Sequence, residues 1–424
     1  MFYLTPLDNM YWIKNTFRLI AFALLILALP VCTGNQEAGR ALDTPKQIAE
    51  ADTVATIAEK PKPLPVDRKF NDMARFIAGM PAEEGSLFAS YAQNPAWQQY
   101  AKGADAQWQS ILNTKLPKIT QWRDQELKEA NARSGLLFYP FSGPDFLHAS
   151  AFFPEADTMV LVGLEPIGNL PDFDKIAQKS LAGYFNGLQQ TLNSILNFSF
   201  FRTNSMAVDF TGKVVSDIDG TLPVLMLFMA RTGHKVLYYE KIAISPEGKI
   251  IPAAEAKADS TYYGTMLAYS SEKDPETRKT LFYFAANLQD TPYSARSGLS
   301  EGGLLQRSDF RKYLESLPIQ TTYIKSASYL MHLAEFSLMR QLILEKSKFY
   351  LQDDSGMPIR FLDRTKWDLI FYGSYISPIS LFSGRYQADL RAIYQKGEGV
   401  RPLPFGIGYQ FREGTSNLML AVKK

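Results

Sequence analysis

Hydrophobic residues are spaced in two different ways along the chain. Between residues 69 and 132 they recur at helical spacing, and Pro117 interrupts the second helical stretch there. Trp97, Trp108 and Trp122 belong to this region. Since large aromatic side chains dominate burial, we expect these three in the core rather than in a sugar-stacking face. From residue 136 onward, short apolar runs have the length of buried strands and alternate with helical patterns.

These patterns predict an α/β fold, with a mixed sheet covered by helices on its faces and preceded by a helical N-terminal segment. The helical segment covers 68–133 and the mixed α/β domain 134–424. Strands are expected at 136–141, 158–164, 235–245, 261–270, 280–288, 405–411 and 417–422. Helices are expected at 145–153, 172–196, 222–230, 304–317, 333–346 and 384–394. A short match between 137–141 and 281–284 suggests a weak internal duplication of this domain.

The amino-terminal end has the parts of a secretory signal of bacterial type. Residues 19–31 read LIAFALLILALPV without a charge, Lys14 and Arg18 precede them, and Cys32 follows. The run is shorter than the roughly 20 apolar residues of a comfortable membrane span. We therefore expect residues 1–34 to direct export. The folded part would then lie in the periplasm, or be membrane-anchored on the outer side of the cytoplasmic membrane or at the outer membrane.

The end of this signal can be interpreted in two ways. In one, Leu29 to Cys32 form a lipoprotein box and Cys32 carries a lipid, although Pro30 and Val31 stand where small residues are preferred. In the other, cleavage near Thr33 or Gly34 releases a protein without an anchor. An uncleaved anchor or a buried apolar helix is a third interpretation. Residues 35–67 contain almost no large apolar residue, which predicts a flexible tether.

Charge and composition exclude several classes of function. Lys plus Arg is 45 and Asp plus Glu is 43, giving a net charge of +2 with both signs interspersed. A nucleic-acid-binding protein would show a basic face or tail, so we expect no nucleic-acid partner. The single cysteine argues against disulfides, thiol catalysis and Cys-ligated zinc. The three histidines are too far apart in sequence for an HExxH-type site, so no metal and no cofactor is expected.

A serine, a carboxylate and a histidine occur together after the first expected strand. Ser142 lies three residues before Asp145, and Pro144 lies between them, a spacing that predicts a helix N-cap of capping-box type at Ser142. Asp145 and His148 are three residues apart and would share a helix face, where the carboxylate orients the imidazole for acid–base chemistry. A cap with a hydrogen-bonded structural histidine is the favoured interpretation.

Two adjacent carboxylates, Asp353 and Asp354, follow a strongly amphipathic helix. The composition of Asp353-Asp354-Ser355-Gly356 is typical of a turn, and we expect this turn to be solvated. In the alternative, the two carboxylates share a proton or bind a cation. Farther on, Gly406 and Gly408 lie in an expected strand and indicate close packing or a bulge rather than a phosphate loop.

One short string, Asp217-Ile218-Asp219-Gly220-Thr221-Leu222, resembles the first motif of haloacid-dehalogenase-type phosphatases. The resemblance implies Asp217 as nucleophile, Asp219 as acid/base, and magnesium as cofactor, held by these residues and Asp353. The residues before Asp217 are too polar and too few for the apolar strand that this motif needs, and a core-type helix follows it directly. The favoured interpretation is an acidic turn that leads into the helix.

Two classes of function follow from the sequence. The favoured one is a non-enzymatic envelope protein that binds a small molecule or another envelope component. The alternative is an exported hydrolase whose dispersed site uses Ser142, Asp145, His148 and Asp353. Convergence of these side chains in one cleft would favour the hydrolase.

Overall fold

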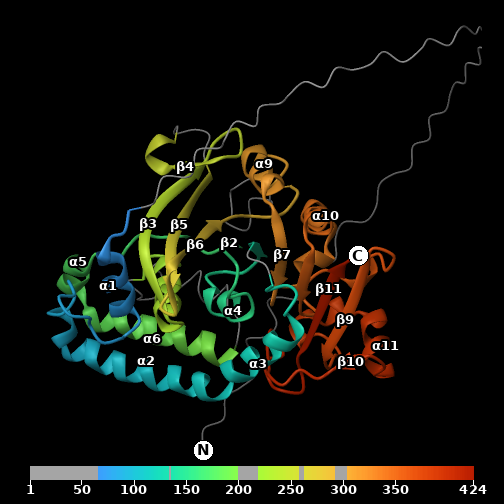
Figure 1. Cartoon of the computed structure of the whole chain (residues 1–424), viewed down its shortest axis with the longest axis horizontal. Coiled ribbons are helices and arrows are strands. Elements are labelled where there is room, and N and C mark those ends of the chain that lie inside the picture. The colour runs from blue at the N-terminus through green and yellow to red at the C-terminus, as the bar shows by residue number, and fades with distance from the viewer. Residues whose placement is uncertain (1–64, 133–134, 199–217, 257–261, 292–302) are drawn as a thin grey trace, which may run out of the picture. The chain divides into compact units, whose positions relative to one another are not determined.

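The computed structural model describes residues 65–132, 135–198, 218–256, 262–291 and 303–424 (Figure 1). Residues 62–424 form one compact unit. The expected export signal at 1–34 and nearly all of the expected tether at 35–67 lie outside the described residues, and so do Cys32 and Asp217. Within the described ranges, no helix has both the length and the apolar character needed to cross a membrane.

One mixed sheet of eleven strands runs through the described part of the chain, in the order β10-β9-β11-β8-β7-β1-β2-β6-β5-β3-β4. Strands β8, β7, β1, β2 and β6 are parallel neighbours. The strands on each side of them join in antiparallel pairs, except that the edge strand β10 is parallel to β9. The bounds are β1 Leu136–Pro140, β2 Thr158–Gly163, β3 His234–Ile244, β4 Ile250–Pro252, β5 Tyr262–Ser271, β6 Asp274–Ala285, β7 Ile319–Ile324, β8 Phe349–Gln352, β9 Trp367–Gly373, β10 Val400–Arg401 and β11 Asn417–Lys423. The predicted α/β class with a mixed sheet is confirmed.

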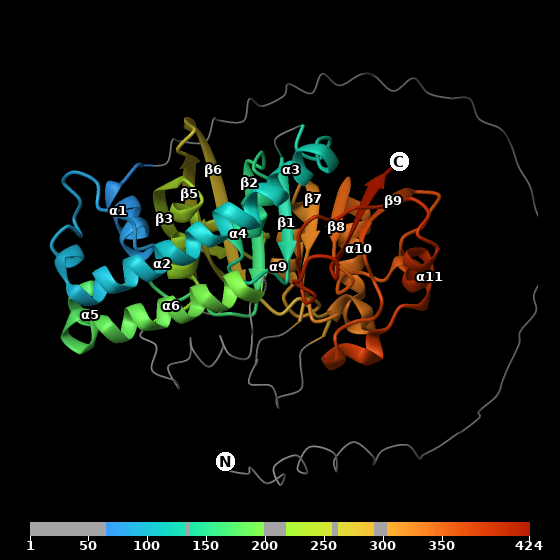
Figure 2. The ribbon, with the colours of Figure 1, turned by 90° about the horizontal axis from the view of Figure 1, so that it is seen from below.

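Helices cover both faces of this sheet (Figures 1 and 2). The first face carries α1 Arg68–Ile77, α2 Pro95–Thr114, α3 Leu116–Glu126, α4 Phe146–Phe152, α5 Phe173–Lys179, α6 Leu181–Phe198 and α8 Leu222–Arg231. Helices α2 and α6 lie side by side there, as Figure 2 shows. The second face carries α9 Ser308–Ser316, α10 Ser337–Lys346 and α11 Ala388–Lys396. The helices at the amino-terminal side therefore share a core with the sheet.

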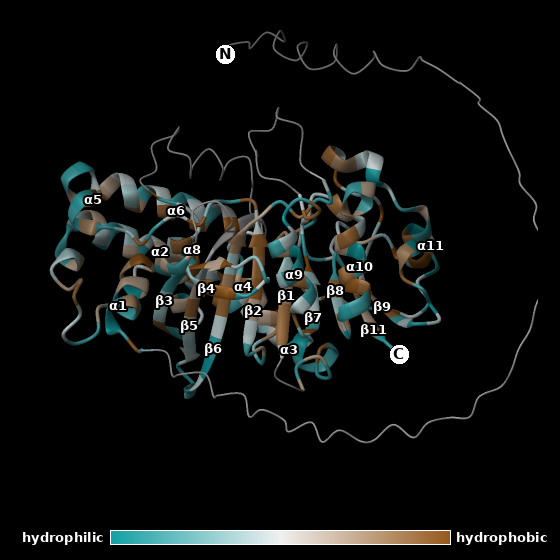
Figure 3. Cartoon of the chain, turned by 90° about the horizontal axis from the view of Figure 1, so that it is seen from above, coloured by the Kyte–Doolittle hydropathy of each residue, from teal (hydrophilic) through white to brown (hydrophobic). Residues whose placement is uncertain are grey.

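The central strands are apolar on both sides because helices cover both of their faces. In β1, Leu137 and Tyr139 face the first core, and Leu136 and Phe138 face the second. This double burial explains the nearly unbroken hydrophobic run, and β1 and β2 are mostly brown in Figure 3. The three tryptophans of the helical segment are buried in the first core, as predicted.

Several predicted elements differ from those in the structure. The strand expected at 405–411 is wrong, because the chain there folds back on itself and forms only an isolated bridge between Ile407 and Gln410. A Cβ atom on Gly406 would lie 1.7 Å from the Phe411 carbonyl oxygen, so the backbones meet too closely for an extended strand. Strands β4, β7, β8, β9 and β10 were not predicted. The matched segments 137–141 and 281–284 fall in β1 and late β6, and the internal duplication stays a prediction.

Candidate functional site

A cavity of about 250 Å³ opens at the carboxyl ends of four adjacent parallel strands, β7, β1, β2 and β6. Helix α4 connects β1 to β2 on the first face, and α9 precedes β7 on the second. Open α/β sheets bind ligands at such places, where the crossovers leave in opposite directions. The cavity is lined mainly by Tyr139, Phe141, Ser142, Gly143, Val162, Gly163, Leu164, Glu165, Ala286, Asn287, Leu288, Lys325, Ser326, Ala327, Ser328, Leu330 and Phe336.

Backbone strain gathers in the loops around this cavity. In the part of the chain that the structure describes, four non-glycine residues have positive φ angles: Phe141 at 62°, Ser326 at 53°, Ser328 at 50° and Tyr329 at 55°. All four lie in the loops that follow β1 and β7, and Phe141, Ser326 and Ser328 line the cavity. Such conformations are disfavoured for residues with a Cβ atom and persist where surrounding contacts enforce them, most often at functional sites.

Side chains from other segments form hydrogen bonds with the backbone of loop 325–329 and hold its strained conformation. The Ser326 N–H donates to Asp353 Oδ2 at 2.9 Å, and the Ala327 N–H donates to Ser355 Oγ at 2.8 Å. The Ser328 N–H donates to the Tyr409 hydroxyl at 3.0 Å, and that hydroxyl donates to the Ser326 carbonyl oxygen at 2.8 Å. Three consecutive amides are thus held from outside the loop, which fixes its shape beside the cavity.

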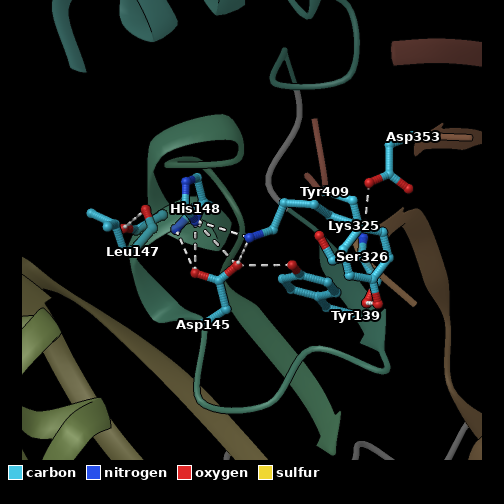
Figure 4. Close-up of polar contacts among 9 residues, drawn as sticks. Tyr139, Asp145, Leu147, His148, Lys325, Ser326, Asp353 and Tyr409 are labelled. Carbon is cyan, nitrogen blue, oxygen red and sulfur yellow. Dashed lines mark hydrogen bonds and ion pairs between the residues drawn. The ribbon is translucent and has the colours of Figure 1, made fainter. Parts of the chain in front are cut away.

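A buried ionic cluster lies at the Tyr139 and Lys325 side of the cavity (Figure 4). The fully buried carboxylate of Asp145 forms an ion pair with the Lys325 ammonium at 2.9 Å. It also accepts hydrogen bonds from the Tyr139 hydroxyl at 2.9 Å and from His148 Nδ1 at 2.9 Å. Tyr139 and Lys325 line the cavity, whereas Asp145 and His148 lie behind them. Helix α4 begins here because Asp145 is its N-cap and accepts the His148 N–H at 3.2 Å.

The charges of this cluster follow from its contacts. Burial disfavours the charged form of Asp145, but its contacts with His148 and with the Lys325 ammonium outweigh this effect and hold the pKa of Asp145 well below its usual range. Burial, together with the charge of Lys325, lowers the pKa of His148 to about 4, so its ring is neutral at pH 7. Since the Asp145 carboxylate only accepts, His148 carries its proton on Nδ1.

The predicted capping box at Ser142 is wrong, because the helix starts three residues later at Asp145. Gly143 takes a positive φ of 56° and turns the chain, and the Ser142 hydroxyl donates to the Val162 carbonyl oxygen at 3.3 Å. Ser142 lines the cavity but has no hydrogen bond to His148 among the contacts of the described residues. A nucleophilic serine activated by this histidine is therefore not assembled.

The predicted solvated turn at Asp353 and Asp354 is also wrong. The turn follows β8, which lies inside the sheet between β7 and β11, and the two carboxylates are only 4% and 6% exposed. Asp353 accepts from the Ser326 N–H and from the N–H and hydroxyl of Ser355. Asp354 accepts from the Tyr329 hydroxyl and from Asn417 Nδ2. Burial and the neighbouring charge of Asp354 raise the pKa of Asp353 to about 7, and burial also raises that of Asp354.

The structure brings three of the predicted site residues close to one loop. Lys325 contacts Asp145 and His148, and the next residue, Ser326, contacts Asp353 (Figure 4). Asp219 is exposed and accepts a hydrogen bond of 2.6 Å from Asn169 Nδ2. Across the described ranges, no group of three or more His, Cys, Asp or Glu side chains could hold a metal ion.

Sequence reasoning missed Lys325 and Tyr139. Lys325 directly follows β7, whose sequence IQTTYI contains three polar residues and resembles a loop more than a buried strand. Its β-branched residues were the available signal, since they favour strands and a lysine at a strand end is well placed to reach a site. Tyr139 was hidden within an apolar run.

Comparisons with protein-family models and with curated proteins found no match for this chain. The function is therefore argued from the site itself.

Proposed function

We propose that the folded part of this protein binds a small organic molecule in the cavity at the carboxyl ends of β7, β1, β2 and β6. The observation that supports this most is that three strained residues line one cavity, Phe141 in one loop and Ser326 and Ser328 in the other. Strain of this kind is maintained against a preference for relaxed backbone, which a ligand-binding loop explains and a purely structural loop does not.

The lining of the cavity suits a ligand with an apolar body and a few polar groups. Phe141, Leu164, Leu288, Leu330 and Phe336 provide apolar walls. Among the buried polar atoms of the described residues, Asn287 Nδ2 and Ser326 Oγ have no hydrogen-bond partner, and both residues line the cavity. Buried polar groups are nearly always paired, so these atoms favour a ligand with acceptor groups. At about 250 Å³, the cavity is slightly below the range of roughly 300–1,000 Å³ of drug-sized sites.

A pair of matched variants tests this proposal. Leu330 and Leu338 are both half-buried, but Leu330 lines this cavity, whereas Leu338 lines a second cavity between α9 and α10. Native mass spectrometry of the chain with small molecules extracted from bacterial cells is expected to show a bound mass. Leu330→Trp should weaken its binding by about tenfold or more, since the indole fills the cavity. Leu338→Trp should leave it unchanged. No bound mass, or equal weakening by both variants, would contradict the proposal.

A hydrolase is the second candidate, and one observation favours it. Tyr139 and Lys325 line the cavity and share Asp145 with His148, so groups that can transfer protons lie at its edge. Ser142 has no bond to His148, so such an enzyme would activate water rather than a serine. A panel of chromogenic esters, amides, phosphoesters and glycosides decides between the two. The binding proposal expects no turnover, and the hydrolase expects turnover that His148→Gln abolishes.

We also propose that the protein is exported and that Cys32 carries a lipid. The uncharged run 19–31 behind Lys14 and Arg18 and the tether-like composition of 35–67 support this. Labelled palmitate fed to producing cells should enter the wild-type protein but not Cys32→Ser. Label in neither protein would exclude the lipid anchor and leave release after cleavage or an uncleaved apolar segment.

A further inference from the structure

Two adjacent buried carboxylates, those of Asp353 and Asp354, lie next to loop 325–329, which lines the cavity. Asp353 and Asp354 are adjacent in sequence, and both are buried. No lysine, arginine or histidine of the described residues forms an ion pair with either. Instead, the hydrogen-bond donors around them are neutral amides and hydroxyls. Two buried carboxylates without a cation repel each other, and one of them tends to keep a proton.

The same carboxylates hold the loop that lines the cavity. Asp353 accepts the N–H of Ser326 and the hydroxyl of Ser355, which in turn accepts the N–H of Ala327. Asp354 accepts the hydroxyl of Tyr329 at the end of the same loop. Three contacts to the strained loop therefore depend directly, or through Ser355, on the charge of this pair. Hydrogen bonds to an ionised carboxylate are about twice as strong as neutral ones.

We infer that protonation of the Asp353–Asp354 pair controls the conformation of loop 325–329, and through it the affinity of the cavity for its ligand. The ionised pair holds the loop in the described conformation, and a protonated pair loosens it. The effect on the loop stands by itself, whereas the effect on affinity rests on the proposed function.

The titratable and charged groups that face Asp353 come from several elements. They are Tyr139 of β1, Tyr323 of β7, Tyr350 of β8, and Tyr329 and Tyr409 of the loops, with Lys325 beside Ser326. Burial raises the pKa of each of these tyrosines, and also that of Tyr375 and Tyr394, which face Asp354, so all these hydroxyls remain neutral. His332 faces Asp354 as well, and burial lowers its pKa to about 4. The pair, with a pKa of about 7 at Asp353, is then the group that changes charge near neutral pH.

A bound cation is the other way to neutralise such a pair, and the contacts disfavour it. Five donor groups, from Ser326, Ser355, Tyr329 and Asn417, point at the four carboxylate oxygens. Each donor points the positive end of its dipole at the carboxylates, so it would repel a cation bound there. These donors fit an anion or a shared proton instead.

Hydrogen exchange in the unliganded full chain tests this directly. The protection of the Ser326 amide, corrected for the intrinsic rate at each pH, is expected to fall about tenfold as the pH is lowered through about 7, because the charge-assisted bond is lost. Asp353→Asn should abolish this transition. Asp363→Asn removes an exposed carboxylate that accepts hydrogen bonds from Thr365 and should leave the transition in place. Equal protection on both sides of the transition, or a transition that survives in Asp353→Asn, would overturn the inference.

A second variant and a test with divalent cations distinguish the inference from misfolding and from cation binding. Ser355→Ala removes a donor that favours the ionised form of Asp353, so the transition should move to higher pH even if Asp353→Asn folds poorly. If the transition appears only with a chelator and disappears with Mg²⁺ or Ca²⁺, the pair is a cation site and the inference fails. Because no ligand is present, a pH-responsive loop together with unaltered small-molecule binding in Leu330→Trp would refute the proposed function alone.

Discussion

Two buried acidic groups lie on either side of loop 325–329, and they differ in what surrounds them. Asp145, the N-cap of α4, contacts the ammonium of Lys325 and keeps its negative charge. Asp353 and Asp354, at the end of β8, meet only neutral donors among the described residues, and the pKa of both is raised. Burial alone would raise the pKa of every one of these carboxyls.

The comparison teaches that the partner rather than the depth of burial decides the charge. A cation at 2.9 Å offsets the desolvation of Asp145, and amides and hydroxyls do not fully offset that of Asp353. The first group is thus a fixed charge that orients Lys325 and His148, and the second is a group whose charge changes near neutral pH. Substitutions at the two places should therefore have opposite effects on stability.

The largest effect is expected from Asp145→Asn. The substitution leaves the ammonium of Lys325 buried without its carboxylate, which should lower the free energy of unfolding by about 3–5 kcal/mol at pH 7. Since the folded state lowers the pKa of Asp145, its contribution is present above the unfolded value of about 4 and is lost as the pH falls below it. Urea unfolding at several pH values measures this. A loss that persists undiminished at low pH would argue against the ion pair as its cause.

Asp353→Asn should act in the opposite direction. The folded state raises the pKa of Asp353 to about 7, so between about pH 4 and 7 it binds more protons than the unfolded chain, and stability falls as the pH rises. The asparagine variant lacks this loss and should be more stable above pH 7 by up to about 4 kcal/mol. Below about pH 4, the two proteins should unfold alike. A variant less stable than the wild type at about pH 8 would contradict the contrast.

A smaller effect is expected where the backbone approaches the second acidic group. A Cβ atom on Gly408 would lie 2.3 Å from Asp353 Oδ2, and Gly408 has a φ of 71°. Gly408→Ala should lower the free energy of unfolding by about 1–3 kcal/mol. Gly414 has a similar φ of 80° but open space around it, so Gly414→Ala measures the backbone strain alone. If both substitutions have the same effect, the close contact with Asp353 contributes nothing.

The sequence predicted the first acidic group better than the second. The apolar runs of β1 and β2 predicted strands, because this pattern is local. The three-residue spacing of Asp145 and His148 predicted that they share a helix face, whereas in the structure Asp145 is the N-cap from which it contacts His148. The cationic partner could not be predicted, since Lys325 lies 180 positions farther along the chain and meets Asp145 only through the pairing of β7 with β1.

The second group was misjudged for a related reason. Its composition correctly predicted a turn, but exposure depends on what covers the turn. Strand β8 has four residues, too few for a recognisable pattern, and its place between β7 and β11 is set by pairing distant in sequence. Loop 325–329 and Gly408 then close over Asp353. Local pattern therefore predicted this turn and the strands β1 and β2, whereas the burial of the site arose from the order of strands.

The central claim is that a small molecule binds in the cavity at the carboxyl ends of β7, β1, β2 and β6. A residue-by-residue map of the binding site tests this claim most directly. Amide chemical shifts of the labelled chain, recorded with and without the small molecules extracted from bacterial cells, would locate the bound molecule. The account predicts shifts confined to the ends of β1, β2, β6 and β7 and the loops after them, including Ser326 and Asn287, and their loss in Leu330→Trp. Shifts that centre on the second cavity between α9 and α10, or that persist in Leu330→Trp, would contradict it.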